Sequence, residues 1–197
     1  VDETIEQPAA SAAAITWMRG TIDRTLSEIE ENFVRYRISD ALMQTYKLFW
    51  DDFSGWYLEI IKPAFGKPID AKTHRETLSI FDTMMKVIHP FMPFITEEIW
   101  QRLEVRPEGS SIMVEKMPLP APYEAGMLTR FDTVREIVSA VRTVRKDRNI
   151  PVKESLVLCA SPGATGTEFD PVIIRMCNLS EIRVIEGKVE GAASFRI

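Results

Sequence analysis

The stretch IHPFMPFITEEIW, residues 88–100, marks the junction between two helices. Residues 73–89 carry apolar side chains at helical spacing, and Pro90 then ends that helix. Pro93 suits the first turn of the next helix, where a backbone N–H has no partner within the helix. The spacing predicts that this next helix turns one stripe towards the core, made of Ile95, Ile99, Trp100 and Leu103.

Two longer helical patterns precede this junction. Apolar residues recur at steps of three and four over residues 11–35, which predicts an amphipathic helix. A second helix is expected to begin near Ser39 and Asp40, either of which could cap it, and to end at Ile61 before Pro63. Because its apolar residues cover more than one face, we expect this helix to pack between neighbours.

The sequence changes character after the junction. Residues 104–126 hold four prolines and two glycines, which indicates a long connection with one brief strand at residues 112–114. A fifth helix with a stripe of valines is expected over residues 128–149. Beyond it the pattern predicts strands at residues 156–159 and 182–185, a helix between them at residues 169–177, and the start of another strand at residues 194–197.

These elements predict a mainly α protein, namely an antiparallel helix bundle followed by a small α/β extension. We place the division after the long connection, so that residues 1–125 form the bundle and residues 126–197 form a basic helix plus the extension. The chain has 197 residues, of which 45% are hydrophobic, and this is enough to bury one good core.

The charge balance argues against a global attraction to nucleic acid, because 24 basic and 29 acidic side chains give a net charge of -5. A local basic segment exists, since residues 130–153 contain seven basic and three acidic residues. At 100° per residue, Arg135, Arg142 and Lys146 fall within about 40° of one another and form what we call the basic ridge. The ridge is our first candidate for contact with RNA phosphates, and an ordinary solvated face is the alternative. A second, weaker candidate group consists of Arg24, Arg35 and Arg37.

Signals for catalysis and metal binding are nearly absent. The sequence has no Gly-rich phosphate loop, and neither His74 nor His89 has a histidine partner at metal-binding spacing. Glu97 and Glu98 are expected to complement a helix dipole, and His89 is expected to be structural. We therefore expect no catalytic, cofactor-binding or metal-binding residues. The aromatic residues Trp50, Phe53, Trp56 and Tyr57 offer stacking surfaces for bases, although their helical spacing favours core packing for most of them.

The cellular compartment is inferred from two absences. Cys159 and Cys177 lack C-x-x-C spacing, and a chain of this size needs no disulfide, which suits the cytosol. No apolar stretch is long enough to span a membrane, so we expect no membrane partner. The chain begins at Val1 without an initiator Met or a basic leader, so we expect it to be cut from a longer protein.

Residues 88–100 also resemble the H-P-F-x-P-F-x-x-E-E-x-W signature of the anticodon-binding bundle in the class I valyl-, isoleucyl- and leucyl-tRNA synthetases. The stretch LFWDDFSGWYLE at residues 48–59, with Lys62-Pro63 after it, looks like the valine branch of that family. Arg142, Arg145 and the stretch NIPVK at residues 149–153 are similar to the family's R-x-x-R and I-P-x-K pattern. The resemblance covers about residues 15–160.

The resemblance implies a region that docks the anticodon arm of a valine-accepting tRNA, with the other synthetase domains as partners. The family's ATP-binding motifs are absent, so the resemblance implies that this chain alone is not catalytic, and ATP is a cofactor of the parent enzyme only. The same region of the isoleucine enzyme, and a helical protein-interaction module without RNA binding, are the alternatives. The family's first bundle helix is missing as well, and we expect self-association or the N-terminal segment to fill the groove it leaves.

Overall fold

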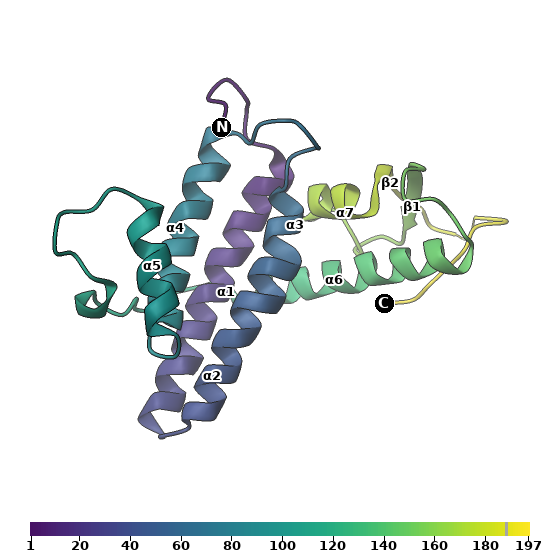
Figure 1. Ribbon diagram of the computed structural model, residues 1–197. Helices are drawn as coiled ribbons and strands as arrows, with labels where there is room; N and C mark the ends of the chain where they lie inside the picture. Colours follow the sequence, from purple (N-terminus) through teal and green to yellow (C-terminus); the bar gives the residue numbers. More distant parts are fainter. Residues whose placement is uncertain (188) are drawn as a thin grey trace.

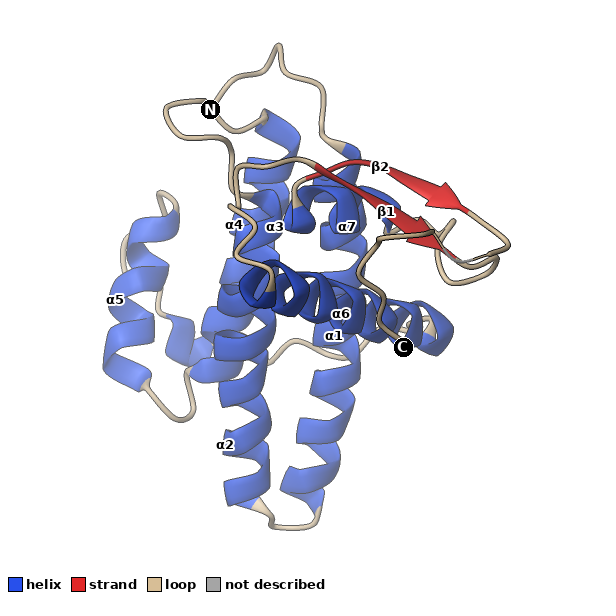
Figure 2. Ribbon diagram, turned by 90° about the vertical axis from the view of Figure 1, so that its right-hand side faces the viewer, coloured by secondary structure: helices blue, strands red, loops and turns tan. Residues whose placement is uncertain are grey.

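The computed structural model describes residues 1–187 and 189–197, and it arranges long helices around a central one (Figure 1). The central helix is α1 (Ala9–Val34), which contacts α2 (Ile38–Lys47), α4 (Ala71–Ile88), α6 (Ala125–Asp147) and α7 (Asp170–Cys177). Helix α6 runs across this bundle rather than along it (Figure 2). With α5 (Pro93–Leu103) packed against α4, the predicted mainly α bundle is confirmed.

Helix starts follow local hydrogen bonding. The Asp70 carboxylate accepts a 2.7 Å hydrogen bond from the Thr73 amide and caps α4. The prediction that Ser39 or Asp40 caps the second helix is wrong. Helix α2 begins two or three residues earlier, because the Arg37 carbonyl already accepts from the Ala41 amide, so both side chains lie inside the first turn.

The predicted continuous helix up to Ile61 contains an unexpected wider segment. Residues Leu48–Tyr57 (η1) form a π-helix, and α3 (Leu58–Ile61) completes the rod before Lys62 ends it. A π-helix adds residues to each turn, so it changes which side chains face the core. Phe53 and Tyr57 are buried against α1 and α4, whereas Trp50 is 59% exposed.

The α4–α5 junction forms as the prolines predict, and His89 has the structural role expected of it. Its Nδ1 lies 2.8 Å from the Thr96 hydroxyl, which also donates to the Met92 carbonyl. Thr96 therefore faces inward and Ile95, about 100° away, faces solvent at 49% exposure. The predicted inward orientation of Ile95 is wrong for this reason, whereas Trp100 is buried as expected.

The connection between α5 and α6 contains no strand at the expected position. Residues Ile112–Val114 form a 3-10 turn (η2), which Glu97 anchors. The Glu97 carboxylate accepts hydrogen bonds from the Ser111 hydroxyl at 2.7 Å and the Ile112 amide at 3.1 Å. Hydrogen bonds from Gln101 and Ser111 hold the pKa of Glu97 below its usual value. Glu97 thus holds this loop in place. From the sequence we expected it only to complement the helix dipole and did not predict the contact with the loop.

The C-terminal part is the predicted α/β extension. Strands β1 (Leu156–Ala160) and β2 (Leu179–Val184) pair in parallel, and the crossover helix α7 connects them. Residues 194–197 form no strand, so that prediction is wrong. Side chains of α6 and α7 share one hydrophobic core with α1, and the division after residue 125 stays a prediction.

Candidate nucleic-acid interface

Helix α6 has a buried face and a solvent face, as its sequence period predicts. The buried face packs on α1 and α7 and contains Met127, Leu128, Phe131, Val134, Ile137, Val138 and Val141. Arg142 and Lys146 lie on the solvent face, and both are exposed. Neither forms an ion pair with any residue in the described ranges, so their charges are available to a ligand.

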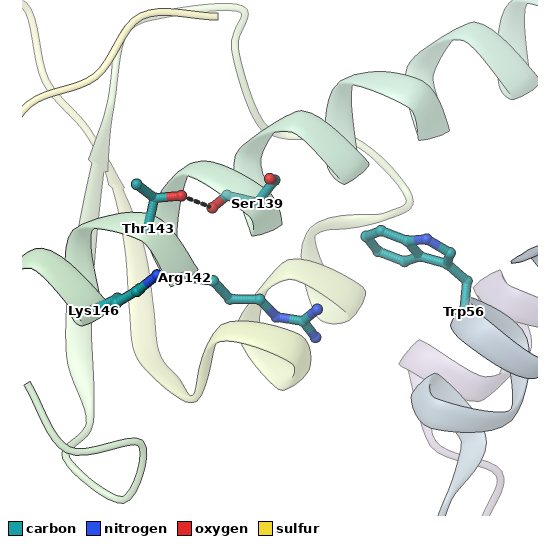
Figure 3. A pocket seen from close by; sticks show the side chains of 5 residues that line it. All are labelled: Trp56, Ser139, Arg142, Thr143 and Lys146. Carbon is teal, nitrogen blue, oxygen red and sulfur yellow. Dashed lines mark hydrogen bonds between the residues drawn. The ribbon is translucent and has the colours of Figure 1, made fainter.

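These two cations line a shallow cleft, which we call the α6 cleft (Figure 3). Its other lining residues are Trp56 from η1 and Ser139 and Thr143 from α6, around a volume of about 290 Å³. The Thr143 hydroxyl donates to the Ser139 carbonyl at 3.0 Å, and this bond occupies its proton. Two cations and an aromatic ring that line one cleft suit a ligand that combines a phosphate with a planar base.

Arg135, the third residue of the predicted basic ridge, has an ion-pair partner and a side chain that is 29% exposed, and its contact with RNA stays a prediction. Its guanidinium pairs with the Asp52 carboxylate and lies 5.1 Å from the centroid of the Trp17 ring and 5.4 Å from that of Trp56. The π-helix turns Asp52 inward, to 8% exposure, and creates this partner. Burial raises the pKa of Asp52, and the hydrogen bond from Arg135 opposes that rise. Arg135 therefore ties α6 to η1, and it also lines a second cleft together with Trp56 and Ser139.

Other basic residues of the 130–153 segment also have internal partners. Arg130 pairs with Glu124 and Glu168. Arg145 is only 6% exposed and donates to the carbonyls of Pro151, Glu154, Cys177 and Asn178 at 2.8 to 3.3 Å. The local positive charge counted from the sequence is consequently larger than the charge that a ligand meets.

The second candidate group is dispersed. Arg24 lies in the middle of α1 with Glu28 at 3.9 Å, whereas Arg35 and Arg37 lie beyond its C-terminal end, about 16 Å further along the helix at 1.5 Å per residue. Arg35 pairs with Glu31, and Arg37 is exposed without an ion pair among the described residues. The structure thus does not bring these three cations together.

The aromatic segment divides between core and surface. Phe53 and Tyr57 are core residues, as their helical spacing favoured. Trp56 is half-buried, packs edge-on against Phe131 and also lines the α6 cleft. Sequence reasoning missed this double role, because η1 and α6 are far apart in the chain; Asp52 and Arg135, which join them, are separated by 83 positions.

Other chemistry is scarce in the described ranges. They contain no group of three or more histidine, cysteine or acidic residues placed to hold a metal ion. Cys159 and Cys177 are both free thiols, and burial raises the pKa of Cys177 to about 11. Within the same ranges, no helix combines the length and the apolar character needed to cross a membrane.

Comparison with known proteins agrees with this geometry. The model of the family described as the anticodon-binding domain of tRNA ligase matches residues 16–160. A valine–tRNA ligase of Parabacteroides distasonis is 49% identical over 197 residues, which is 100% of this chain and 22% of that protein. The corresponding proteins of Phocaeicola vulgatus and Porphyromonas gingivalis are 45% and 46% identical, over 98% and 99% of this chain and 22% of each protein. The chain therefore spans about a fifth of the length of these curated relatives.

Proposed function

The chain belongs to the family of anticodon-binding domains of tRNA ligases, and we propose that it docks the anticodon arm of a valine-accepting tRNA within a valine–tRNA ligase. The relatives named valine–tRNA ligase support the valine branch over the isoleucine alternative. The parent enzyme would join valine to its tRNA using ATP, in the cytosol, with its remaining domains as partners of this one.

The observation that carries the proposal is the α6 cleft, which is lined by the ring of Trp56 and by Arg142 and Lys146, two cations without an ion pair in the described ranges. Phosphates bind such cations through charge and the release of counterions, and unstacked bases bind aromatic rings. Arg135 ties α6 to η1 through Asp52, and Arg145 ties α6 to the end of α7, so the cleft lies between elements that are joined to one another.

The test is the affinity of the purified chain for individual tRNAs, measured by fluorescence anisotropy over a range of salt concentrations. We expect valine-accepting tRNA to bind more tightly than isoleucine-accepting tRNA and the affinity to fall as salt rises. Equal, salt-independent binding of every tRNA, or no binding at all, would contradict the proposal.

We further propose that the chain has no ligase activity of its own and uses no cofactor. Its sequence lacks a phosphate-binding loop, and the α6 cleft lacks any carboxylate that could hold a magnesium ion. ATP–pyrophosphate exchange in the presence of valine should therefore stay at background with the purified chain, and exchange above background would refute this.

The exposed apolar face of α2 supports one further proposal, self-association. Ile38, Leu42, Tyr46 and Trp50 recur every four residues and are each 47% to 59% exposed. The N-terminal segment does not cover them, because Asp2 bridges to Asp70 at the start of α4. Occupation of the missing helix's groove by the N-terminal segment stays a prediction, and for this exposed face a second copy of this chain is the occupant we propose.

A further inference from the structure

The turn between α1 and α2 contains an aromatic residue where the backbone favours glycine or asparagine. Tyr36 has a φ of +57°, in the left-handed region. Its amide donates to the Phe33 carbonyl at 3.0 Å, and the Arg37 amide donates to the Asn32 carbonyl at 2.8 Å. This pair of bonds defines a Schellman motif, in which Tyr36 occupies the left-handed position.

The same chain contains a matched example with the expected residue. At the end of α6, Asn149 has a φ of +53°. Its amide donates to the Lys146 carbonyl, and the Ile150 amide donates to the Arg145 carbonyl. Asparagine tolerates this backbone because its short side chain bonds locally, whereas a bulky side chain is strained there. Tyr36 thus carries a conformational cost that Asn149 largely avoids.

The Tyr36 ring has no packing contact among the described residues that would offset this conformational cost. It is 90% exposed and stacks on no other ring in the described ranges. Among the residues that the structure describes, its hydroxyl has no hydrogen-bond partner, in contrast to Tyr57, whose hydroxyl lies 2.8 Å from that of Thr77. A strained, exposed aromatic residue at a turn is a feature of binding sites rather than of stable cores.

The flanking side chains indicate the charge of a ligand. Arg35 and Arg37 lie on either side of Tyr36, and residues 33–39 contain no acidic residue. Arg37 is exposed and has no ion-pair partner among the described residues. Arg35 pairs with Glu31, and both of these side chains are more than half exposed, so the pair is weak and a stronger anion can displace it.

From these observations we infer that Tyr36 stacks on an unpaired base of RNA while Arg35 and Arg37 contact the adjacent phosphates. The inference rests on the proposed function and adds a second contact, distinct from the α6 cleft. Trp17 of α1 stacks on Phe131 of α6, and the end of α1 lies about 25 Å beyond it at 1.5 Å per residue. Contacts this far apart should contribute independently to affinity.

The test compares two glycine variants, Tyr36→Gly and Asn149→Gly, with an RNA stem-loop and with a fully paired duplex of equal length. Tyr36→Gly should raise the Tm by about 2–4 °C, since glycine relieves the left-handed strain. It should nevertheless raise the Kd for the stem-loop roughly 5- to 150-fold, the range for one stacked base. The Kd for the duplex should change less than about twofold, because a duplex offers no unpaired base.

Tyr36→Phe keeps the ring and should retain affinity, and Asn149→Gly should leave both affinities unchanged. An equal loss for duplex and stem-loop, or unchanged stem-loop affinity in Tyr36→Gly, would overturn the inference. A change in self-association alone, measured by sedimentation of Tyr36→Gly, would also overturn the inference, since the turn would then contact protein and not RNA. If Arg142→Gln with Lys146→Gln weakens binding while Tyr36→Gly does not, only this inference fails. If the unaltered chain binds no RNA, the proposed function fails with it.

Discussion

The guanidinium of Arg135 pairs with the carboxylate of Asp52, a residue 83 positions earlier in the chain. This contact joins α6 to the π-helix η1 and gives Arg135 an ion-pair partner, whereas Arg142 and Lys146 on the same helix have none in the described ranges. Three arginine and lysine residues with the same helical phase therefore have different roles. Replacing Arg135 should mainly lower stability, whereas replacing Arg142 and Lys146 should mainly weaken tRNA binding.

Arg135→Gln should lower the free energy of unfolding by about 1–3 kcal/mol, because it leaves Asp52 buried without its cation. Arg142→Gln, its matched control on the same helix, should change stability by less than about 0.5 kcal/mol. Urea unfolding followed by circular dichroism measures both. Equal stabilities of the two variants would show that the Asp52 contact contributes nothing.

Arg142→Gln combined with Lys146→Gln should weaken tRNA binding with little loss of stability. Each lost phosphate contact makes the slope of log affinity against log salt shallower by about 0.7–0.9, so two contacts give about 1.4–1.8. Lys67→Gln with Lys72→Gln removes two exposed charges near the start of α4 and serves as the control. If both double variants change the slope equally, the α6 cleft is an ordinary solvated face.

Arg145→Lys should destabilise the C-terminal part by about 2–4 kcal/mol, although it keeps the charge. A lysine ammonium cannot reach the four carbonyls that the guanidinium fork satisfies, so some of them lose their donor in a buried site. Hydrogen exchange should quicken in β1 and α7 more than in α4. Uniform quickening across the chain would instead indicate a global effect.

Cys177 should resist alkylation in the folded protein, since burial raises its pKa to about 11. A raised pKa means that the folded state holds the thiol proton more tightly than the unfolded state. Stability from this group is thus fully present below about pH 9 and is lost as the pH rises towards 11. Cys177→Ser should flatten this loss in urea melts between pH 8 and 11, and unchanged curves would contradict the assignment.

Leu42→Glu combined with Trp50→Glu should abolish the self-association proposed for α2. These side chains are exposed, so the monomer should remain folded, whereas charges in an apolar interface oppose dimer formation. Sedimentation equilibrium over a range of concentrations measures the effect, and the exposed pair Arg102→Glu and Lys116→Glu is the control. A chain that stays monomeric before any substitution would refute this proposal.

Local sequence determined the helices and their ends to within a few residues. The apolar periods of α1, α4 and α6, together with Pro90, Pro93 and Pro63, act through near neighbours in the chain, and near neighbours are visible in a sequence. The β-type runs at β1 and β2 and the α7 crossover between them were predictable for the same reason.

Only the tertiary structure decided which charges and rings are available. Phase on a straight helix placed Arg135 with Arg142, but the π-helix turned Asp52 inward and supplied Arg135 with a partner from a distant segment. Arg145 likewise finds its carbonyl partners across α7, and Trp56 becomes part of the cleft only because α6 crosses the bundle beside it. Sequence period fixes the direction of a side chain relative to its own helix, whereas packing between helices fixes what that side chain meets.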